Sequence, residues 1–169
     1  MNLIQYARTK LKGRLKVAVE NGLIAEEGVT VMGGVNFGSE PYLITLRKNC
    51  RISTDVLFIT HDGGTWAFRN TWEQYKDVVK YGRIEIGENS FIGARSIIMP
   101  GCRIGCNCVV GAGSVVTKSV PDGTVVAGVP AKFMCTTLEY AEKSLKSMPE
   151  NFDYTAYMKD KKKYLSDYI

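Results

Sequence analysis

Large aliphatic residues recur at every sixth position through the middle of the chain. The longest uninterrupted run consists of Ile86, Ile92, Ile98, Ile104, Val110 and Val116. The same spacing appears earlier, at Leu46, Ile52 and Phe58. Because this period is neither 2 nor 3.6 residues, it matches neither a simple strand nor an amphipathic helix. It predicts instead an internal repeat of short strands and turns.

A column of small residues keeps the same period. Four residues after successive aliphatic positions stand Ser90, Ser96, Cys102, Cys108 and Ser114, with Cys50 at the same phase. Glycine directly follows four members of the aliphatic run, at Gly87, Gly93, Gly105 and Gly111. Stacked six-residue units would therefore form one column of large side chains and a second column where space is limited. We expect the glycines to occupy turns whose backbone angles a Cβ forbids.

The six-residue phase breaks between residues 59 and 83, and both ends of the chain have a different pattern. The break is long for a loop, so we expect it to be extruded from the repeat and to be functional. Segment 2–21 has apolar residues at helical spacing, flanked by lysine and arginine, and predicts an amphipathic helix that contains Gly13. This helix would pack on the repeat or on a neighbouring subunit, or else contact a membrane surface or a partner. After Pro130 the pattern becomes helical again and ends in a polar, lysine-rich tail.

These hexads resemble the hexapeptide-repeat acyltransferase family over about residues 29–134. The resemblance implies an all-β core, a left-handed parallel β-helix in which three hexads form one triangular coil. Short N-terminal and C-terminal helices and one extruded loop, about residues 59–83, would complete the fold. We therefore expect a single domain over residues 1–169, with a helix and lead-in at 1–28 and a C-terminal helix and polar tail at 135–169.

Composition sets limits on the class of protein. Hydrophobic residues make up 45% and charged residues 23% of the chain, as in soluble globular proteins. The formal charge of +5 suits an anionic small molecule as well as a nucleic acid and decides little by itself. Since only this mild charge favours a nucleic acid, we expect no nucleic-acid partner. The N-terminus shows no apolar core with a small-residue cleavage site, and no segment is apolar enough to span a bilayer. With five cysteines and no export signal, we expect a cytoplasmic protein with reduced thiols.

The sequence contains one histidine, His61, at the start of the extruded segment. Acyl transfer from a thioester to a hydroxyl or amine requires a base that removes the acceptor's proton. A neutral imidazole accepts a proton near pH 7, since its ordinary pKa is about 6.5. By itself the residue could be an incidental loop histidine. In the family that these hexads resemble, the catalytic histidine stands beside a coil at the start of an extended loop, so the resemblance implies that His61 is the general base.

Several nearby residues are candidates for orienting the base or binding the acceptor. Asp62 either orients the histidine or simply begins the Asp-Gly-Gly turn, and Glu40 is a second carboxylate that could reach it from the preceding coil. Trp66 and Arg69 either cover the acceptor, since a flat ring stacks on a sugar face, or only pack within the loop. Phe91 stands where many family members carry an aromatic residue near the catalytic histidine, which implies a place at the acceptor.

Two stretches match the family's C-terminal signature, residues 111–118 and 128–132. Coenzyme A presents a pantetheine arm to backbone groups and phosphates to lysine. By matching positions, the resemblance implies acetyl-CoA as co-substrate, with contacts from Ala94, Ala112, Thr117, Lys118 and Lys132. The alanines and the threonine also satisfy coil geometry alone, and the two lysines could simply be solvated.

Cysteine offers a rival mechanism through an acyl-enzyme. Cys50, Cys102 and Cys108 belong to the small-residue column, so packing explains them. Cys106 and Cys135 lie outside the column, and the sequence places no base beside either. The cysteine spacing is not that of a zinc site and no histidine stands nearby. We therefore expect neither a cysteine nucleophile nor a metal.

The residues present narrow the family further. One histidine cannot hold the zinc of a β-helical carbonic anhydrase, and segment 1–28 is too short for the helical domain of serine acetyltransferases. The Thr-His-Asp-Gly-Gly-Thr-Trp stretch, residues 60–66, resembles small O-acetyltransferases of capsule, lipopolysaccharide and exopolysaccharide synthesis. The resemblance implies an O-acetyltransferase that acts on a sugar hydroxyl. It also implies a homotrimer with active sites between subunits.

Two alternatives stay open. One is N-acetylation of a nucleotide-linked amino-sugar, where the acceptor is an amine. The other is a trimeric scaffold without catalysis, which would dock partners through its basic N-terminal helix. The same helix could bring the protein into peripheral contact with a membrane. Intact His61, Lys118 and Lys132 argue against the scaffold.

Overall fold

The computed structural model describes residues 13–168 and divides the chain into two compact units. The first unit ends at Thr137 and contains the repeat, and the second unit begins at Leu138. A single domain over residues 1–169 stays a prediction.

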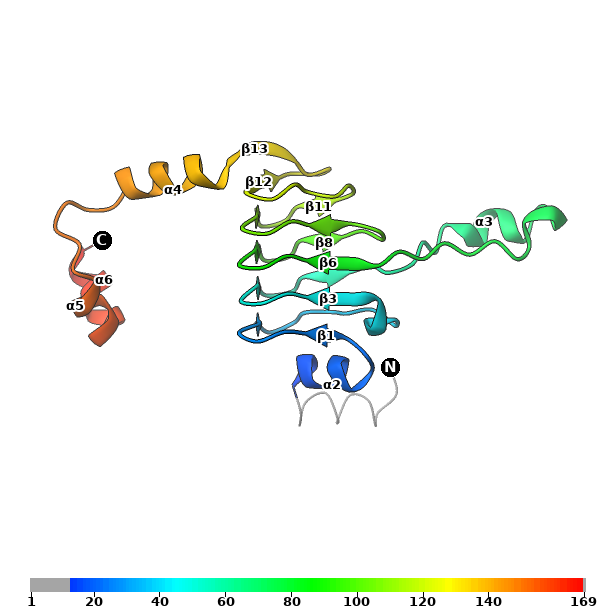
Figure 1. The fold of residues 1–169 in the computed structure, drawn as a ribbon, viewed down its shortest axis with the longest axis horizontal. Coiled ribbons are helices and arrows are strands. Elements are labelled where there is room, and N and C mark those ends of the chain that lie inside the picture. Colours follow the sequence, from blue (N-terminus) through cyan, green and yellow to red (C-terminus); the bar gives the residue numbers. More distant parts are fainter. Residues whose placement is uncertain (1–12, 169) are drawn as a thin grey trace. The chain divides into compact units, whose positions relative to one another are not determined.

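Short strands build the first unit and belong to three sheets, named A, B and C (Figure 1). Sheet A has the order β1 (Ile24–Ala25), β3 (Ile44–Leu46), β6 (Ile84–Ile86) and β9 (Arg103–Ile104). Sheet B runs β2 (Thr30–Val31), β4 (Arg51–Ile52), β7 (Phe91–Ile92), β10 (Val109–Val110), β12 (Thr124–Ala127) and β13 (Lys132–Thr136). Sheet C comprises β5 (Leu57–Phe58), β8 (Ile97–Ile98) and β11 (Val115–Val116). All neighbours pair in parallel except β12 and β13, and consecutive strands pass from sheet to sheet, so the chain winds as a parallel β-helix.

The six-residue period places each large aliphatic residue on the inside of its strand. Ile52, Ile92 and Val110 stack in register along sheet B, and each is 0% exposed. Ile92 and Val110 are paired although they lie eighteen residues apart, so three hexads complete one coil. The predicted repeat is therefore confirmed. Full burial of each such side chain stabilises the fold by about 1.5–3 kcal/mol, so the column contributes strongly to stability.

The small residues fill the narrow corners of the coils, as predicted. Cys50, Cys102 and Cys108 are all buried. The buried hydroxyl of Ser90 donates to the carbonyl of Gly105 at 2.7 Å and accepts from the N–H of Cys108 at 2.9 Å. Because this hydroxyl has partners on both sides, it links two coils without the cost of an unsatisfied polar group.

The glycines of the repeat allow close packing of coils, and the turn explanation for them was wrong. None of the four, Gly87, Gly93, Gly105 and Gly111, has a positive φ. A Cβ on Gly87 would lie 2.4 Å from the carbonyl carbon of Gly105 in the next coil, which leaves room only for hydrogen. Left-handed backbone is found instead at corner residues, including Asn and Asp that tolerate it. The non-glycine residues among them are Asn49, Asp55, Asn89, Arg95 and Asn107, and other glycines, such as Gly101 and Gly113, also have a positive φ.

Residues 60–82, called the arm, leave the repeat between β5 and β6 (Figure 1). The two ends of the arm pair as an antiparallel ribbon, because Asp62 N–H donates to the carbonyl of Lys80 and Gly82 N–H to that of Thr60, both at 2.9 Å. Two short helices lie farther out, α3 (Thr65–Arg69) and the 3-10 helix η2 (Glu73–Tyr75). The extrusion predicted from the break in phase is confirmed.

The N-terminal helix is shorter than predicted within the described residues. Helix α2 (Arg14–Glu20) begins only after Gly13, whose φ of 77° is not helical. Segment 2–12 of the predicted helix lies outside the described residues. Helix α2 packs on the repeat, since Ala18 is buried and Arg14 donates to the carbonyl of Val35 at 3.1 Å. Among residues 13–168, no helix is long and apolar enough to cross a membrane.

The second unit is helical, including the lysine-rich tail that the sequence predicted only as polar. It contains α5 (Tyr154–Lys159), α6 (Lys161–Tyr168) and all of α4 (Thr137–Lys146) except its first residue. The side chain of Asp153 caps α5 by accepting from the N–H groups of Thr155 and Ala156. Aromatic contacts join α5 to α6, with the rings of Tyr157 and Tyr164 at 6.2 Å. These contacts explain why the tail is ordered as a helix.

Candidate active site

His61 and Glu40 lie at one corner of the β-helix, where the chain leaves sheet C. Strands β5, β8 and β11 are stacked, so the residues that follow them, Ile59, Met99 and Thr117, lie above one another in successive coils. His61 follows β5 at this corner. Glu40 reaches the same corner one coil earlier, because Asn36 pairs in parallel with Leu57. The repeat therefore brings together two residues that are 21 positions apart in the chain.

Glu40 holds two donors from the next coil on a single carboxylate oxygen. Its Oε2 accepts from the hydroxyl of Thr60 at 2.6 Å and lies 2.9 Å from Nδ1 of His61. The Glu40 side chain is only 13% exposed, whereas that of His61 is 45% exposed and can meet a substrate. The hydrogen bond from Thr60 is the main cause that lowers the pKa of Glu40 to about 2, against burial and with the help of His61.

This geometry assigns the two ring nitrogens of His61. An ionised carboxylate only accepts hydrogen bonds, so Nδ1 must carry the proton that it shares with Glu40. In the neutral ring, Nε2 then has the free lone pair. The arrangement can take a proton at Nε2 and stabilise the resulting imidazolium through the negative charge of Glu40.

Asp62, the other predicted orienting carboxylate, is engaged elsewhere. One oxygen accepts from the N–H of Gly64 at 2.9 Å, and the other pairs with Nζ of Lys80 at 3.0 Å. The pKa of Asp62 is lowered chiefly by Lys80, with His61 the weakest cause. The contacts therefore match the Asp-Gly-Gly turn interpretation, and Glu40 holds the position beside the ring.

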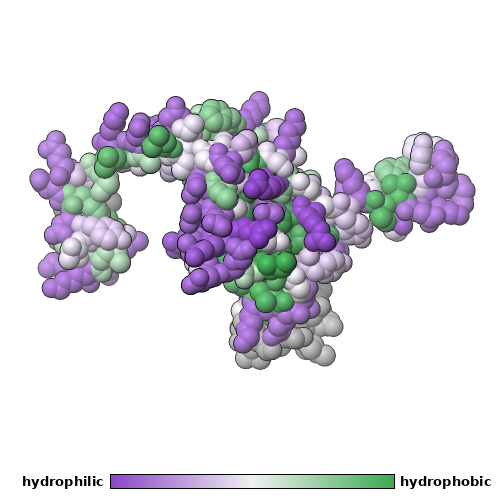
Figure 2. Space-filling model, viewed as in Figure 1, coloured by the Kyte–Doolittle hydropathy of each residue, from purple (hydrophilic) through white to green (hydrophobic). Residues whose placement is uncertain are grey.

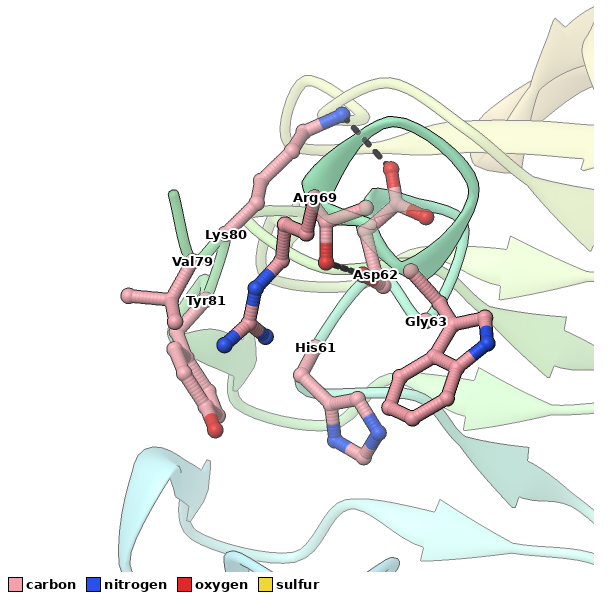
Figure 3. A pocket seen from close by; sticks show the side chains of 9 residues that line it. His61, Asp62, Gly63, Arg69, Val79, Lys80 and Tyr81 are labelled. Carbon is pink, nitrogen blue, oxygen red and sulfur yellow. Dashed lines mark hydrogen bonds and ion pairs between the residues drawn. The ribbon is translucent and has the colours of Figure 1, made fainter. Parts of the chain in front are cut away.

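His61 opens into a pocket at the base of the arm (Figure 3). Trp66 and Arg69 of α3 line this pocket, as does Tyr81 on the returning side of the arm. The Tyr81 ring is tilted over His61 with a centroid distance of 5.7 Å. The pocket thus joins an imidazole, aromatic surface and a guanidinium, a combination that suits the ring and polar groups of a sugar. The two predicted acceptor residues of the arm do meet the histidine here.

Phe91, also predicted near the histidine, is not among the residues that line this pocket. It lies on β7 of sheet B, between Arg51 and Val109, and is 39% exposed. Within one chain, therefore, the structure does not join Phe91 to the histidine pocket.

The predicted coenzyme residues lie on the later coils. Ala94 and Ala112 occupy equivalent corners of adjacent coils, and the carbonyl of Ala94 accepts from Gly113 N–H at 2.8 Å. The exposed Thr117 and Lys118 follow β11, two coils beyond the corner of His61 and so about 10 Å away along the stack. The N–H of Ala131 donates to the carbonyl of Val115, and the N–H of Val115 donates to the carbonyl of Gly128. These two hydrogen bonds place the segment before Lys132 over β11.

Sequence reasoning missed three contributors to the site. Thr60 is buried, and its hydroxyl donates to the same Glu40 oxygen that His61 contacts. The only sequence signal for this role is that Thr60 directly precedes the histidine. Tyr81 and Lys80 enter from the far end of the arm through antiparallel pairing with His61 and Asp62. The spacing of the hexads carries no information about that pairing.

The thiols of the small-residue column are poor nucleophiles. Burial raises the pKa of Cys50 to about 12, and it also raises those of Cys102 and Cys108. Since the thiolate is the nucleophilic form, these groups are unreactive near pH 7. Within residues 13–168, no group of three or more His, Cys, Asp or Glu side chains could hold a metal ion.

Comparison with known proteins finds relatives that contain the same six-residue repeat. A family model described as the hexapeptide repeat of succinyl-transferase matches residues 83–118. Protein CapG of Staphylococcus aureus is 50% identical over 119 residues, which make up 70% of this chain and 65% of CapG. This chain spans less than two thirds of the length of the first curated relatives that it matches.

Two solved structures extend the likeness to the fold. The maltose O-acetyltransferase of Clostridium difficile 630 has a TM-score of 0.52 and 25% identity, with 73% of this chain and 74% of that chain covered. A mutant of AntD, an N-acyltransferase from Bacillus cereus in complex with dTDP-4-amino-4,6-dideoxyglucose and coenzyme A, has a TM-score of 0.50 and 25% identity. The match covers 71% of this chain and 67% of AntD.

Proposed function

Because the chain belongs to the hexapeptide-repeat acyltransferase family, we propose that it transfers the acetyl group of acetyl-CoA to a sugar hydroxyl, with His61 as general base. The observation that carries this proposal is the 2.9 Å contact between Nδ1 of His61 and the ionised Glu40. It leaves Nε2 as the proton acceptor beside an exposed pocket. The name of the structurally similar maltose O-acetyltransferase supports a hydroxyl acceptor.

The transfer proceeds directly, without an acyl-enzyme. Nε2 of His61 removes the proton of the acceptor hydroxyl while the oxygen attacks the thioester carbonyl. Backbone N–H groups stabilise the negative charge of the tetrahedral intermediate. The intermediate collapses by breaking the carbon–sulfur bond, and the imidazolium returns its proton to the leaving thiolate of coenzyme A. Glu40 stabilises the imidazolium between these two steps and stays ionised.

The coenzyme lies along the later coils in this proposal. Ala94 and Ala112 offer main-chain groups to the pantetheine arm, and Thr117 continues that path. Lys118 and Lys132 meet the phosphates as exposed positive charges. The stacking of β5, β8 and β11 supports this path, because Thr117 shares the corner of the histidine. We take the coil to be left-handed on the likeness to the maltose enzyme.

A second subunit completes the site in this proposal. The pocket of one chain holds about 130 Å³, whereas a site that encloses a small ligand has about 300–1,000 Å³. The arm exposes large hydrophobic residues, among them Trp72 and Val79, and Figure 2 shows hydrophobic residues at its surface. A homotrimer would cover this surface and bring another chain's residues, such as Phe91, towards the histidine. We place the protein in the cytoplasm, where acetyl-CoA is available.

The acceptor in this proposal is a saccharide of bacterial capsule, lipopolysaccharide or exopolysaccharide synthesis, on the resemblance of residues 60–66. N-acetylation of a nucleotide-linked amino-sugar is the second candidate, and the likeness to AntD favours it. The two differ only in the group that loses its proton, so the same base could serve either reaction.

Initial-rate kinetics test the proposal. Thiol release from acetyl-CoA is measured on sugars that are matched in pairs, with a hydroxyl or an amine at one position. We expect turnover of the hydroxyl member and intersecting double-reciprocal lines, as direct transfer requires both substrates on the enzyme. Parallel lines would indicate a ping-pong acyl-enzyme and contradict the mechanism. Turnover of the amine member alone would contradict O-acetylation and support N-acetylation as the activity.

A further inference from the structure

Arg69 is held in the histidine pocket by one backbone carbonyl from the other side of the arm. Its Nε–H donates to the carbonyl of Lys76 at 2.9 Å, a bond across the arm that fixes the plane of the guanidinium. In Figure 3 the guanidinium points into the pocket on the side of Tyr81 and His61. The two terminal nitrogens of Arg69 are therefore presented end-on to whatever occupies the pocket.

The other cations of the arm already have carboxylate partners. Nζ of Lys80 pairs with Asp62 at 3.0 Å, and Nζ of Lys76 pairs with Glu73 at 2.6 Å. Among the ion pairs of residues 13–168, none includes Arg69, although Asp77 follows Lys76 directly. The pocket thus offers one uncompensated positive charge with two parallel donors.

We infer that the acceptor is an acidic sugar whose carboxylate is bound end-on by Arg69 while a hydroxyl of the same ring meets His61. This inference rests on the proposed function and adds the class of acceptor. A planar guanidinium matches a carboxylate through two parallel hydrogen bonds. A phosphate monoester carries nearly two negative charges, and here a second free cation is lacking within the arm. Because a single pocket holds both Arg69 and His61, the two groups of the acceptor belong to one ring.

The test compares kcat/KM for a hexuronic acid, its uronamide and the corresponding neutral hexose. The wild type should prefer the acid by at least about tenfold, mainly through KM, because the bidentate pair is made before the reaction. Arg69→Gln should remove this preference, because it lowers kcat/KM for the acid at least about tenfold more than kcat/KM for the neutral hexose. Lys76→Gln is the matched control, since it removes a cation of the arm but keeps the carbonyl that holds Arg69, and it should keep the preference.

Several outcomes would overturn the inference. Equal kcat/KM for acid and neutral sugars in the wild type would do so, as would an equal loss on both in Arg69→Gln. A preference for a neutral sugar carried on a nucleoside diphosphate, lost in Arg69→Gln, would assign the guanidinium to phosphate instead. If none of the sugars is acetylated, ligand-observed NMR compares the affinities of the wild type for the hexuronic acid and for the hexose. Equal affinities would overturn the inference. Failure of the proposed function is a separate result, because it appears as activity that survives His61→Ala.

Discussion

Glu40 and His61 form the pair on which the proposed chemistry depends. The hydrogen bond from Thr60 lowers the pKa of the Glu40 carboxyl, and the ionised carboxylate fixes the proton of His61 on Nδ1. The sequence offered both Asp62 and Glu40 for this position. Two residues next to each other in a chain usually point apart, and Asp62 indeed turns to Lys80. The hexad pattern is irregular between Glu40 and His61, so the sequence does not show that Glu40, one coil earlier, stands beside the ring.

Glu40→Gln tests the positioning role of the carboxylate. The amide can still accept from Nδ1, but it supplies no negative charge to the imidazolium. We expect kcat to fall on the order of 10- to 100-fold with KM for acetyl-CoA unchanged. Asp62→Asn is the control, since that side chain does not touch the ring, and its kcat should stay within about twofold. A larger fall in Asp62→Asn than in Glu40→Gln would exchange the two roles.

The depressed pKa of Glu40 also predicts how stability depends on pH. Its folded-state pKa of about 2 lies below the ordinary value of 4.5, so the unfolded state binds the proton first as pH falls. The stabilisation from ionised Glu40 is thus complete above about pH 4.5 and is lost as pH falls towards 2. Denaturant unfolding of the wild type and Glu40→Gln at pH 7, 4 and 3 measures this. The free-energy difference between them should shrink only at the acidic end, and a constant difference would contradict the assignment.

At the scale of elements, the hexads predicted the strands and the arm but not the contacts within the arm. A six-residue period with a buried aliphatic at each step determines where each strand sits and which residues stack. The arm has no such period. Its ends pair through backbone groups, and its pocket residues Arg69 and Tyr81 meet His61 only because of that pairing. The pattern predicted where the glycines stand. The reason for them is close contact between coils, which is seen only when the backbone of the neighbouring coil is known.

Close contact between coils predicts a specific cost for a methyl group. Gly87→Ala would place a Cβ 2.4 Å from the carbonyl of Gly105, so the backbone of one coil must shift. We expect the free energy of unfolding to fall by about 2–4 kcal/mol. Gly33→Ala is the control, because nothing lies within 4 Å of its added Cβ and its φ is not positive. Urea unfolding of both variants measures the difference, and equal stabilities would refute the packing explanation.

On the scale of the whole molecule, one chain supplies the proposed base and a pocket of about 130 Å³. The exposed Trp66, at 72%, and the separate location of Phe91 on sheet B are features that a second subunit would complete. How subunits meet cannot be read from hexad spacing, since it depends on which outward residues of each sheet face another copy.

Assembly is therefore a prediction of its own. Light scattering after gel filtration should give three times the chain mass of 18.7 kDa for the active species. Trp72→Ser on the exposed arm should weaken the trimer, because it removes apolar area that a neighbour would cover. A monomer with full activity would contradict the shared site.

The role of His61 is tested most directly by acetyl-CoA turnover in wild type and His61→Ala, measured by thiol release with the best acceptor. We predict a fall in kcat of at least about a hundredfold, with binding of coenzyme A unchanged, because the variant lacks only the group that takes the proton. Activity within a few-fold of the wild type would show that His61 is not the base and would contradict the mechanism.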